Sequence, residues 1–355
     1  MTSRRFQSLG SLLSGVTVVS LASVIVAAQA PTATKVASGS STKDKTWVVP
    51  RTQDGQPDLH GVWANNNMTP LQRPPQWAGK EFLSDAEMAA LKKAAAAAVD
   101  AGDDAVFGDA LVLAALANEK AKSFEPSTGN YNNFWLVERE VSNRTSLVVD
   151  PPDGRVPPLT QEARTRAAAL GEWRRLHPAD GPESRSLSER CLTFGAPRVG
   201  AGYNSYYQII QSAGYVAIIH ELGHEVRLIP VDARPHVGPQ LRQWMGDSRG
   251  RWEGDTLVVE TGNFSSRSNF MGSADKLQLV ERFTRVSPTT ITYEFTVSDP
   301  TTWTRQWTAM IPLKHTDDKI YEYACHEGNT GMEGILSGHR TEEQAVEEAV
   351  KKASR

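Results

Sequence analysis

The stretch that decides the fold is residues 215–231, which read Y-V-A-I-I-H-E-L-G-H-E-V-R-L-I-P-V. Two runs rich in β-branched residues flank the central pentapeptide H-E-L-G-H, and such residues favour strands over helices. Gly223 lies where a hairpin would turn, and Pro230 would end a helix soon after the second histidine. The stretch therefore predicts a β-hairpin.

The same pentapeptide matches the zinc motif H-E-x-x-H. On a helix, His220 and His224 would lie one turn apart and bind zinc, and the glutamate would polarise the metal-bound water of a hydrolase. The longer metzincin motif fails, because Arg227 stands where it requires glycine and Pro230 where it requires a third histidine. We expect no metal cofactor and keep a zinc-dependent hydrolase as the alternative.

Short alternating runs separated by turn residues continue to the C-terminal region, the pattern of an antiparallel meander. In the run 290–298, every second residue is apolar, as expected of a half-buried strand. Closure into a lipocalin-like barrel or a strongly curved sheet would remove the exposed edges. The expected strands are 205–212, 214–221, 225–232, 256–261, 277–285, 290–298 and 303–311, with 319–326 as a possible eighth.

The segments before the meander predict a mainly β protein with an α-helical N-terminal part. Residues 49–180 are expected to form an irregular arm and helices that pack on the barrel. Ser84 begins an alanine-rich helical stretch that breaks near Gly102, and residues 160–176 are amphipathic. A barrel domain over 181–340 and a C-terminal helix or tail over 341–355 complete the predicted organisation.

The N-terminus has the features of a secretory signal over residues 1–30. Arg4 and Arg5 precede an apolar run, and A-Q-A at residues 28–30 matches an A-x-A cleavage site. Both the Sec and the twin-arginine routes stay open. Residues 31–48 are rich in Ser, Thr, Lys and Ala and are expected to be a disordered linker. No later run is long enough to span a bilayer, so we predict a periplasmic or secreted bacterial protein without stable membrane insertion.

Charge and cysteine content narrow the classes further. A net charge of −3 with 22% charged residues gives no electrostatic basis for binding nucleic acid. Gly-rich phosphate loops, G-x-S-x-G elbows and C-x-x-C pairs are absent from the sequence. The even cysteine count predicts a disulfide between Cys191 and Cys325, with two buried free thiols as the alternative.

Residues 243–261, Q-W-M-G-D-S-R-G-R-W-E-G-D-T-L-V-V-E-T, resemble the hallmark of a large, mostly uncharacterised family of secreted bacterial proteins. The resemblance covers most of the mature chain, including residues 51–63 and the run Y-E-Y-A-C-H-E-G-N at 321–329. It implies no established activity. It also implies that the position of His220 is often filled by another residue in relatives, which argues against zinc.

Three classes of function remain. The first is a barrel that binds a small apolar or aromatic molecule, as a carrier or as a metal-free acid–base enzyme of the isomerase, cyclase or lyase type. The second is the zinc hydrolase, and the third is a structural or interaction protein without catalysis.

For a barrel that binds a small molecule, specific residues are candidates for catalysis and for ligand binding. In an enzyme, the working groups would be Glu221, His224 and His326, assisted by Arg227 and His236. The expected ligand wall, for which plain core packing is the alternative, comprises Trp244, Trp252, Trp303, Trp307, Tyr321 and Tyr323.

Overall fold

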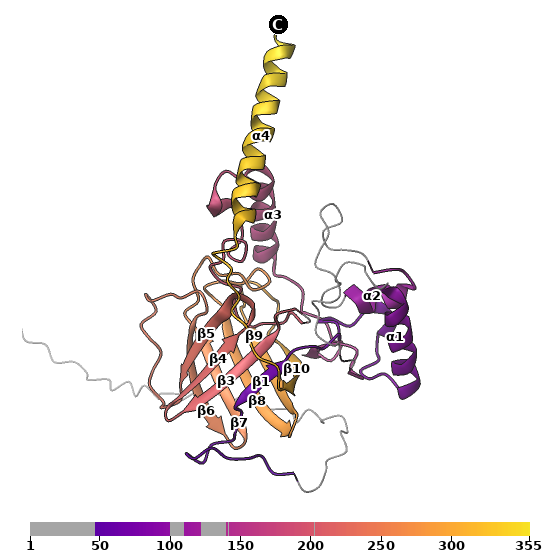
Figure 1. The fold of residues 1–355 in the computed structure, drawn as a ribbon, viewed down its shortest axis with the longest axis vertical. Coiled ribbons are helices and arrows are strands. Elements are labelled where there is room, and N and C mark those ends of the chain that lie inside the picture. Colours follow the sequence, from indigo (N-terminus) through magenta and orange to yellow (C-terminus); the bar gives the residue numbers. More distant parts are fainter. Residues whose placement is uncertain (1–46, 100–109, 122–139, 141, 202) are drawn as a thin grey trace, which may run out of the picture. The chain divides into compact units, whose positions relative to one another are not determined.

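The computed structural model describes residues 47–99, 110–121, 140, 142–201 and 203–355 (Figure 1). The predicted signal peptide and nearly all of the predicted linker lie outside the described residues. No helix within the described ranges is long and apolar enough to cross a bilayer.

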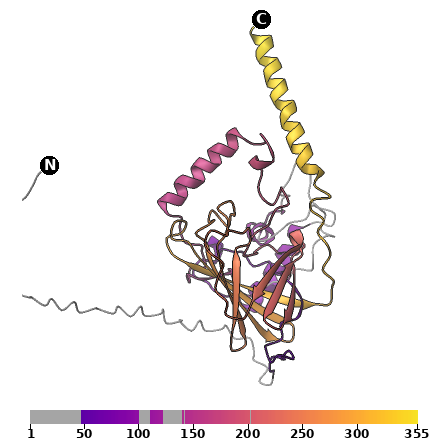
Figure 2. The same cartoon turned by 90° about the vertical axis from the view of Figure 1, so that its left-hand side faces the viewer.

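The described strands form one antiparallel sheet that curves into a nearly closed barrel (Figures 1 and 2). Its hydrogen-bonded order is β5-β4-β3-β1-β10-β9-β8-β7-β6, with β2 pairing β10 off this path. The end strands β5 and β6 are consecutive in the chain and lie side by side, so the strands form an up-and-down meander around the barrel. The strands are β1 Gly61–Ala64, β2 Val148–Asp150, β3 Tyr206–Ser212, β4 Tyr215–His220, β5 Glu225–Pro230, β6 Asp247–Glu253, β7 Thr256–Gly262, β8 Gln278–Ser287, β9 Thr290–Ser298 and β10 Trp307–Thr316.

Four features differ from the sequence prediction. β1 comes from the segment that was expected to be an irregular arm, yet it pairs with both β3 and β10 and joins the two halves of the meander. β6 was missing from the expected strands, although it lies within residues 243–261, the stretch that carries the family resemblance. Residues 319–326 form no strand, and the last strand begins at Trp307 instead of residue 303.

The seam between β5 and β6 depends on Gly250. A Cβ atom there would lie 2.7 Å from Cγ1 of Val231 and 3.0 Å from Cγ2 of Ile229. Both distances are too short for ordinary packing, so the glycine allows β6 to approach the chain of β5 closely.

Aromatic side chains fill the barrel. The rings of Phe283 and Tyr293 stack with centroids 4.6 Å apart, and Phe295 meets Trp307 edge to face at 5.8 Å. In β9, residues at alternate positions are buried, as the sequence period predicted. Trp303 and Trp307 are 1% and 0% exposed and contact each other, so they belong to this core and not to a ligand wall.

A buried ion pair crosses the barrel beside the seam. Nη1 of Arg227 on β5 lies 2.9 Å from Oε1 of Glu281 on β8, and the hydroxyl of Tyr293 donates to the same oxygen at 2.8 Å. Nη2 of Arg227 donates to the hydroxyls of Ser248 and Thr261, each at 3.0 Å. Arg227, a predicted catalytic residue, therefore ties β5 to three other strands.

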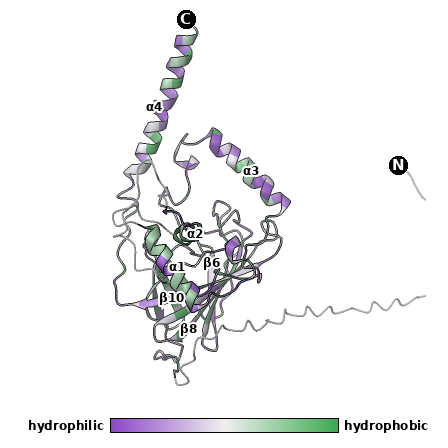
Figure 3. Ribbon diagram, turned by 90° about the vertical axis from the view of Figure 1, so that its right-hand side faces the viewer, coloured by the Kyte–Doolittle hydropathy of each residue, from purple (hydrophilic) through white to green (hydrophobic). Residues whose placement is uncertain are grey.

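Four α-helices flank the strands within the described ranges: α1 Asp85–Ala98, α2 Ala110–Ala117, α3 Gln161–Leu176 and α4 Thr330–Ala353, together with 3-10 turns η1 Pro75–Trp77, η3 Pro182–Ser184 and η4 Leu222–His224. The predicted helices begin at Ser84 and Thr160, and the structure shows that Ser84 caps α1 in a capping box with Glu87 and that Thr160 caps α3. Figure 3 shows α1 as largely hydrophobic, whereas α3 and α4 carry both kinds of residue. α1 and α2 share a small core, and α4 buries none of its side chains.

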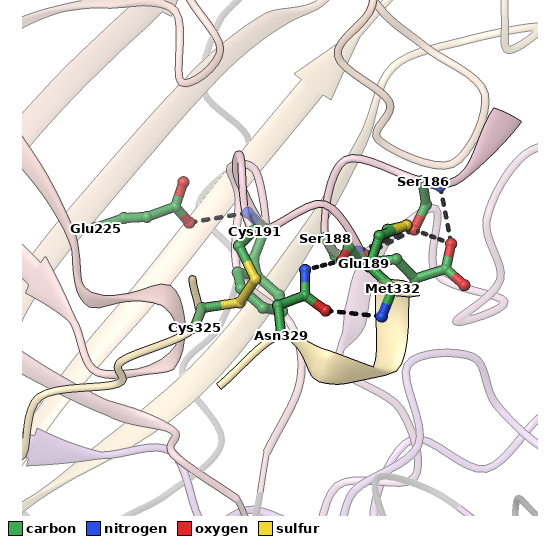
Figure 4. The surroundings of a disulfide bond; sticks show 9 residues. Ser186, Ser188, Glu189, Cys191, Glu225, Cys325, Asn329 and Met332 are labelled. Atoms are coloured by element: carbon green, nitrogen blue, oxygen red, sulfur yellow. Dashed lines mark hydrogen bonds between the residues drawn. A yellow bond between two sulfur atoms is a disulfide. The ribbon is translucent and has the colours of Figure 1, made fainter. Parts of the chain in front are cut away.

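The predicted disulfide joins Cys191 to Cys325, with their Cα atoms 5.6 Å apart (Figure 4). Beside it, the side-chain amide of Asn329 donates to the carbonyl of Glu189 at 2.9 Å and accepts from the backbone N–H of Met332 at 3.3 Å. The segment before α4 is therefore fastened covalently to the loop that precedes β3.

Candidate functional site

The H-E-L-G-H segment closes a β-hairpin, as predicted. β4 ends at His220, η4 makes the turn, and β5 begins at Glu225. Gly223 has a φ of 80°, and a Cβ there would lie 2.5 Å from Cδ2 of Phe194, so both backbone geometry and packing require glycine. The two histidines do not share a helical face, which removes the zincin geometry. Among the described residues, no three His, Cys, Asp or Glu side chains are grouped to hold a metal ion.

His220 occupies the last inward-facing position of β4. It pairs in register with Tyr207 of β3, and the two rings meet edge to face with centroids 4.6 Å apart. The residue is 5% exposed, and its Nε2 atom has no hydrogen-bond partner among the described residues. Burial lowers the pKa of His220 well below its usual range, and the cations Arg198 and Arg227 lower it further. Its imidazole is therefore neutral.

A cavity of about 310 Å³ opens at the end of the barrel where His220 lies, and we call it the rim cavity. His220 and the segment before β3 form much of its wall. The described lining residues are Arg198, Gly200, Ala201, Tyr203, Asn204, Ser205, Tyr206, Tyr207, His220 and Leu222.

Hydrogen bonds from the barrel hold this wall in place. The side-chain amide of Asn65, just after β1, donates to the carbonyls of Val199 and Gly200 at 3.2 and 3.0 Å. The hydroxyl of Ser205 donates to the carbonyl of Asn65 at 2.8 Å, and that of Tyr207 donates to the carbonyl of Arg198 at 3.0 Å. The cavity is therefore built largely before any ligand arrives.

Arg198 is the cation of the rim cavity. Its guanidinium lies over the ring of Phe194, 5.1 Å from the centroid, and makes no hydrogen bond or ion pair with a described residue. Burial lowers the pKa of Arg198 because desolvation disfavours its charge. The nearby carboxylate of Glu225 is already engaged, since it accepts from the hydroxyl of Thr193 and, at 3.0 Å, from the backbone N–H of Phe194.

The predicted catalytic residues are spread over several places. Glu221 is buried, its pKa is raised by burial, and it accepts the backbone N–H of Tyr321 at 3.3 Å. His224 is exposed in the same turn and close enough to oppose that rise electrostatically. His236 contacts Asp247, Nδ1 to Oδ2, at 2.8 Å.

The other two predicted catalytic residues, Arg227 and His326, lie apart from Glu221 and His224. Arg227 is enclosed in the barrel, and exposed His326 lines a separate cavity of about 700 Å³ beside α4. The structure thus keeps Glu221 and His224 together but does not form one acid–base site from the predicted set.

The predicted ligand wall is dispersed as well. Trp244 lines a cavity of about 320 Å³ among arginines, and Trp252 lines one of about 240 Å³ near the turn between β3 and β4. Tyr321 is 69% exposed, while Tyr323 meets Phe194 edge to face at 5.9 Å. With Trp303 and Trp307 in the core, the six aromatics form no common surface.

Sequence reasoning missed Arg198 and Tyr207, and it considered His220 only as a zinc ligand. The alternation of β3 could have placed Tyr207 inside the barrel beside His220. Arg198 gave no comparable signal, because it lies in a Gly-rich loop without periodicity.

Comparison with known proteins found no match: no protein-family model, curated protein or solved structure matches the chain.

Proposed function

We propose that this protein binds a small molecule with an apolar or aromatic body in the rim cavity. The observation that carries this proposal is the unpartnered Nε2 atom of buried His220 in the cavity wall. A buried polar group without a hydrogen-bond partner destabilises the folded protein by about 1–3 kcal/mol, and a ligand that hydrogen-bonds to it would offset that cost.

The size and lining of the rim cavity agree with such a ligand. Its volume of about 310 Å³ is at the lower end for small-molecule sites, which are mostly apolar with a few polar groups. Tyr203, Tyr206 and Tyr207 offer ring surfaces for an aromatic body. Burial raises the pKa of Tyr207, so its phenol stays neutral.

Binding as a carrier is favoured over acid–base catalysis. A general acid–base mechanism needs a second group that exchanges a proton with the substrate near neutral pH. Among the described lining residues there is no carboxylate, and Glu221 is turned to the backbone of Tyr321 instead.

We further propose that the protein is exported and belongs to the family of secreted bacterial proteins that residues 243–261 resemble. The disulfide supports this, because such bonds persist in oxidising compartments. Cell fractionation and N-terminal sequencing test it. We expect periplasmic or secreted material that begins near residue 31, and full-length protein in the cytoplasm would contradict export.

Native mass spectrometry of protein purified from its own compartment tests the binding proposal. We expect a co-purified small molecule on the wild type that is lost from His220→Phe, which keeps an aromatic ring but has no polar atom for the ligand. His177→Phe is the matched control, since His177 is exposed at the end of α3. A ligand retained equally by both variants would contradict binding at the rim cavity. Absence of any ligand would favour the structural or interaction role.

A further inference from the structure

Arg198 differs from the other arginines that are largely withdrawn from solvent. Arg227 is paired with Glu281, and Arg249 contacts Asp247 at 2.6 Å. Arg198 is half-buried, but its guanidinium has neither an ion pair nor a hydrogen bond to a described residue. Removing a guanidinium from water without giving it a partner is unfavourable. The guanidinium of Arg198 therefore lacks a direct anionic partner among the described residues.

The acidic residues near Arg198 make no ion pair with it. Glu225 is engaged by Thr193 and Phe194, and Glu221 faces the backbone of Tyr321. Asp318, close to the cavity through Tyr206, accepts that residue's hydroxyl at 2.8 Å. Glu225 is close enough to favour the charge of Arg198 electrostatically but makes no ion pair with it, so the rim cavity offers a guanidinium without a direct partner and, at His220, a neutral imidazole whose Nε2 atom has no hydrogen-bond partner among the described residues.

We propose that the ligand of the rim cavity carries a carboxylate, which binds the guanidinium of Arg198 and accepts a hydrogen bond from Nε2–H of His220. The inference rests on the proposed function and names the class of ligand. A planar carboxylate matches the fork of an arginine side chain. One carboxylate balances one guanidinium, whereas a phosphate monoester brings nearly two negative charges at neutral pH. The apolar body of the acid would lie along the tyrosine rings.

Titration calorimetry with matched acids and amides tests this proposal. The probes are benzoate and hydrocinnamate, their amides, and phenyl phosphate, each titrated into the mature disulfide-bonded protein. We expect an acid to bind wild type about tenfold to a hundredfold more tightly than its amide, the range of a charge-assisted hydrogen bond. Phenyl phosphate should bind more weakly than the better acid.

Substitutions at Arg198 show whether this residue causes the preference for an acid over its amide. Arg198→Met keeps the packing over Phe194 and should bind acid and amide equally, while Arg198→Lys should keep part of the preference. Arg234→Met is the matched control, because Arg234 also lies over an aromatic ring, that of Tyr215, at 5.1 Å but pairs with Asp232 outside the cavity. This control should keep the full preference. Thermal unfolding of each variant checks that it is folded.

The outcomes separate this inference from the proposed function. Equal binding of acid and amide to wild type, with both lost in His220→Phe, would overturn the carboxylate but retain the binding site. A preference that survives Arg198→Met, or tighter binding of phenyl phosphate, would also overturn it. If no probe binds, the inference fails. The proposed function fails with it only if the purified protein also carries no ligand. The acid-to-amide ratio of wild type decides the matter even if Arg198→Met does not fold.

Discussion

Replacing Glu281 with glutamine should strongly destabilise the barrel. The change keeps the size of the side chain but removes the negative charge beside Arg227, whose side chain is 3% exposed. Breaking a buried ion pair by removing one partner costs about 3–5 kcal/mol, because the other charge stays buried and uncompensated. Since domains are stable by about 5–15 kcal/mol, Glu281→Gln should remove a large fraction of the total.

The matched control lies on the same part of the sheet. Glu260 on β7 pairs with Arg251 on β6, but both side chains are about half exposed, at 48% and 49%. Exposed pairs contribute less than about 1 kcal/mol, so Glu260→Gln should have a small effect. A double variant, Arg227→Met with Glu281→Leu, should be more stable than Glu281→Gln, because no buried charge is left alone.

Equilibrium unfolding in urea, followed by tryptophan fluorescence, measures these differences. We expect the midpoint of Glu281→Gln to fall far below that of Glu260→Gln, with the slope unchanged. If the two single variants lie within about 1 kcal/mol of each other, or if the double variant is the less stable, then the buried pair does not hold the seam as we argue.

Three further predictions concern stability. Below pH 6.5 the free energy of unfolding of wild type should fall by about 1.4 kcal/mol per pH unit relative to that of His220→Phe, because the unfolded histidine takes up a proton while burial keeps the pKa of the folded residue well below 6.5. Parallel profiles of unfolding free energy against pH would contradict this. Gly250→Val should cost about 1–3 kcal/mol in urea unfolding through overpacking against Val231, and a neutral result would mean that the seam is loose. Replacing both Cys191 and Cys325 with serine opens a link across 134 residues and should cost about 5 kcal/mol, whereas two titratable thiols in unreduced wild type would refute the disulfide.

The meander could be predicted because its signals are local. In residues 215–231, β-branched runs and one glycine specify the hairpin without reference to the rest of the chain. β1 could not be found in this way, since its four residues lie in a Pro- and Gly-rich segment and are fixed by pairing with strands far along the chain. The exposed helix α4 was recognised, but its start at Thr330 was placed about ten residues too late.

The candidate site was less accessible to sequence reasoning. His220 could be singled out, but its role depends on whether its ring nitrogen finds a partner in three dimensions. The same holds for Arg198, because an unpaired arginine and a paired one look alike in a sequence. Trp303 and Trp307 show the converse, since aromatic residues suited to a ligand wall were needed to fill the barrel.

Binding at His220 is tested most directly by nitrogen-15 NMR of the histidine side chains during a titration with hydrocinnamate. The chain has 8 histidines, and the His220 signals are assigned by their loss in His220→Phe. We predict that the Nε2 resonance of His220 shifts saturably while those of His236 and His326 stay in place. A saturable shift at His236 or His326 with an unchanged His220 resonance would contradict the rim cavity as the binding site.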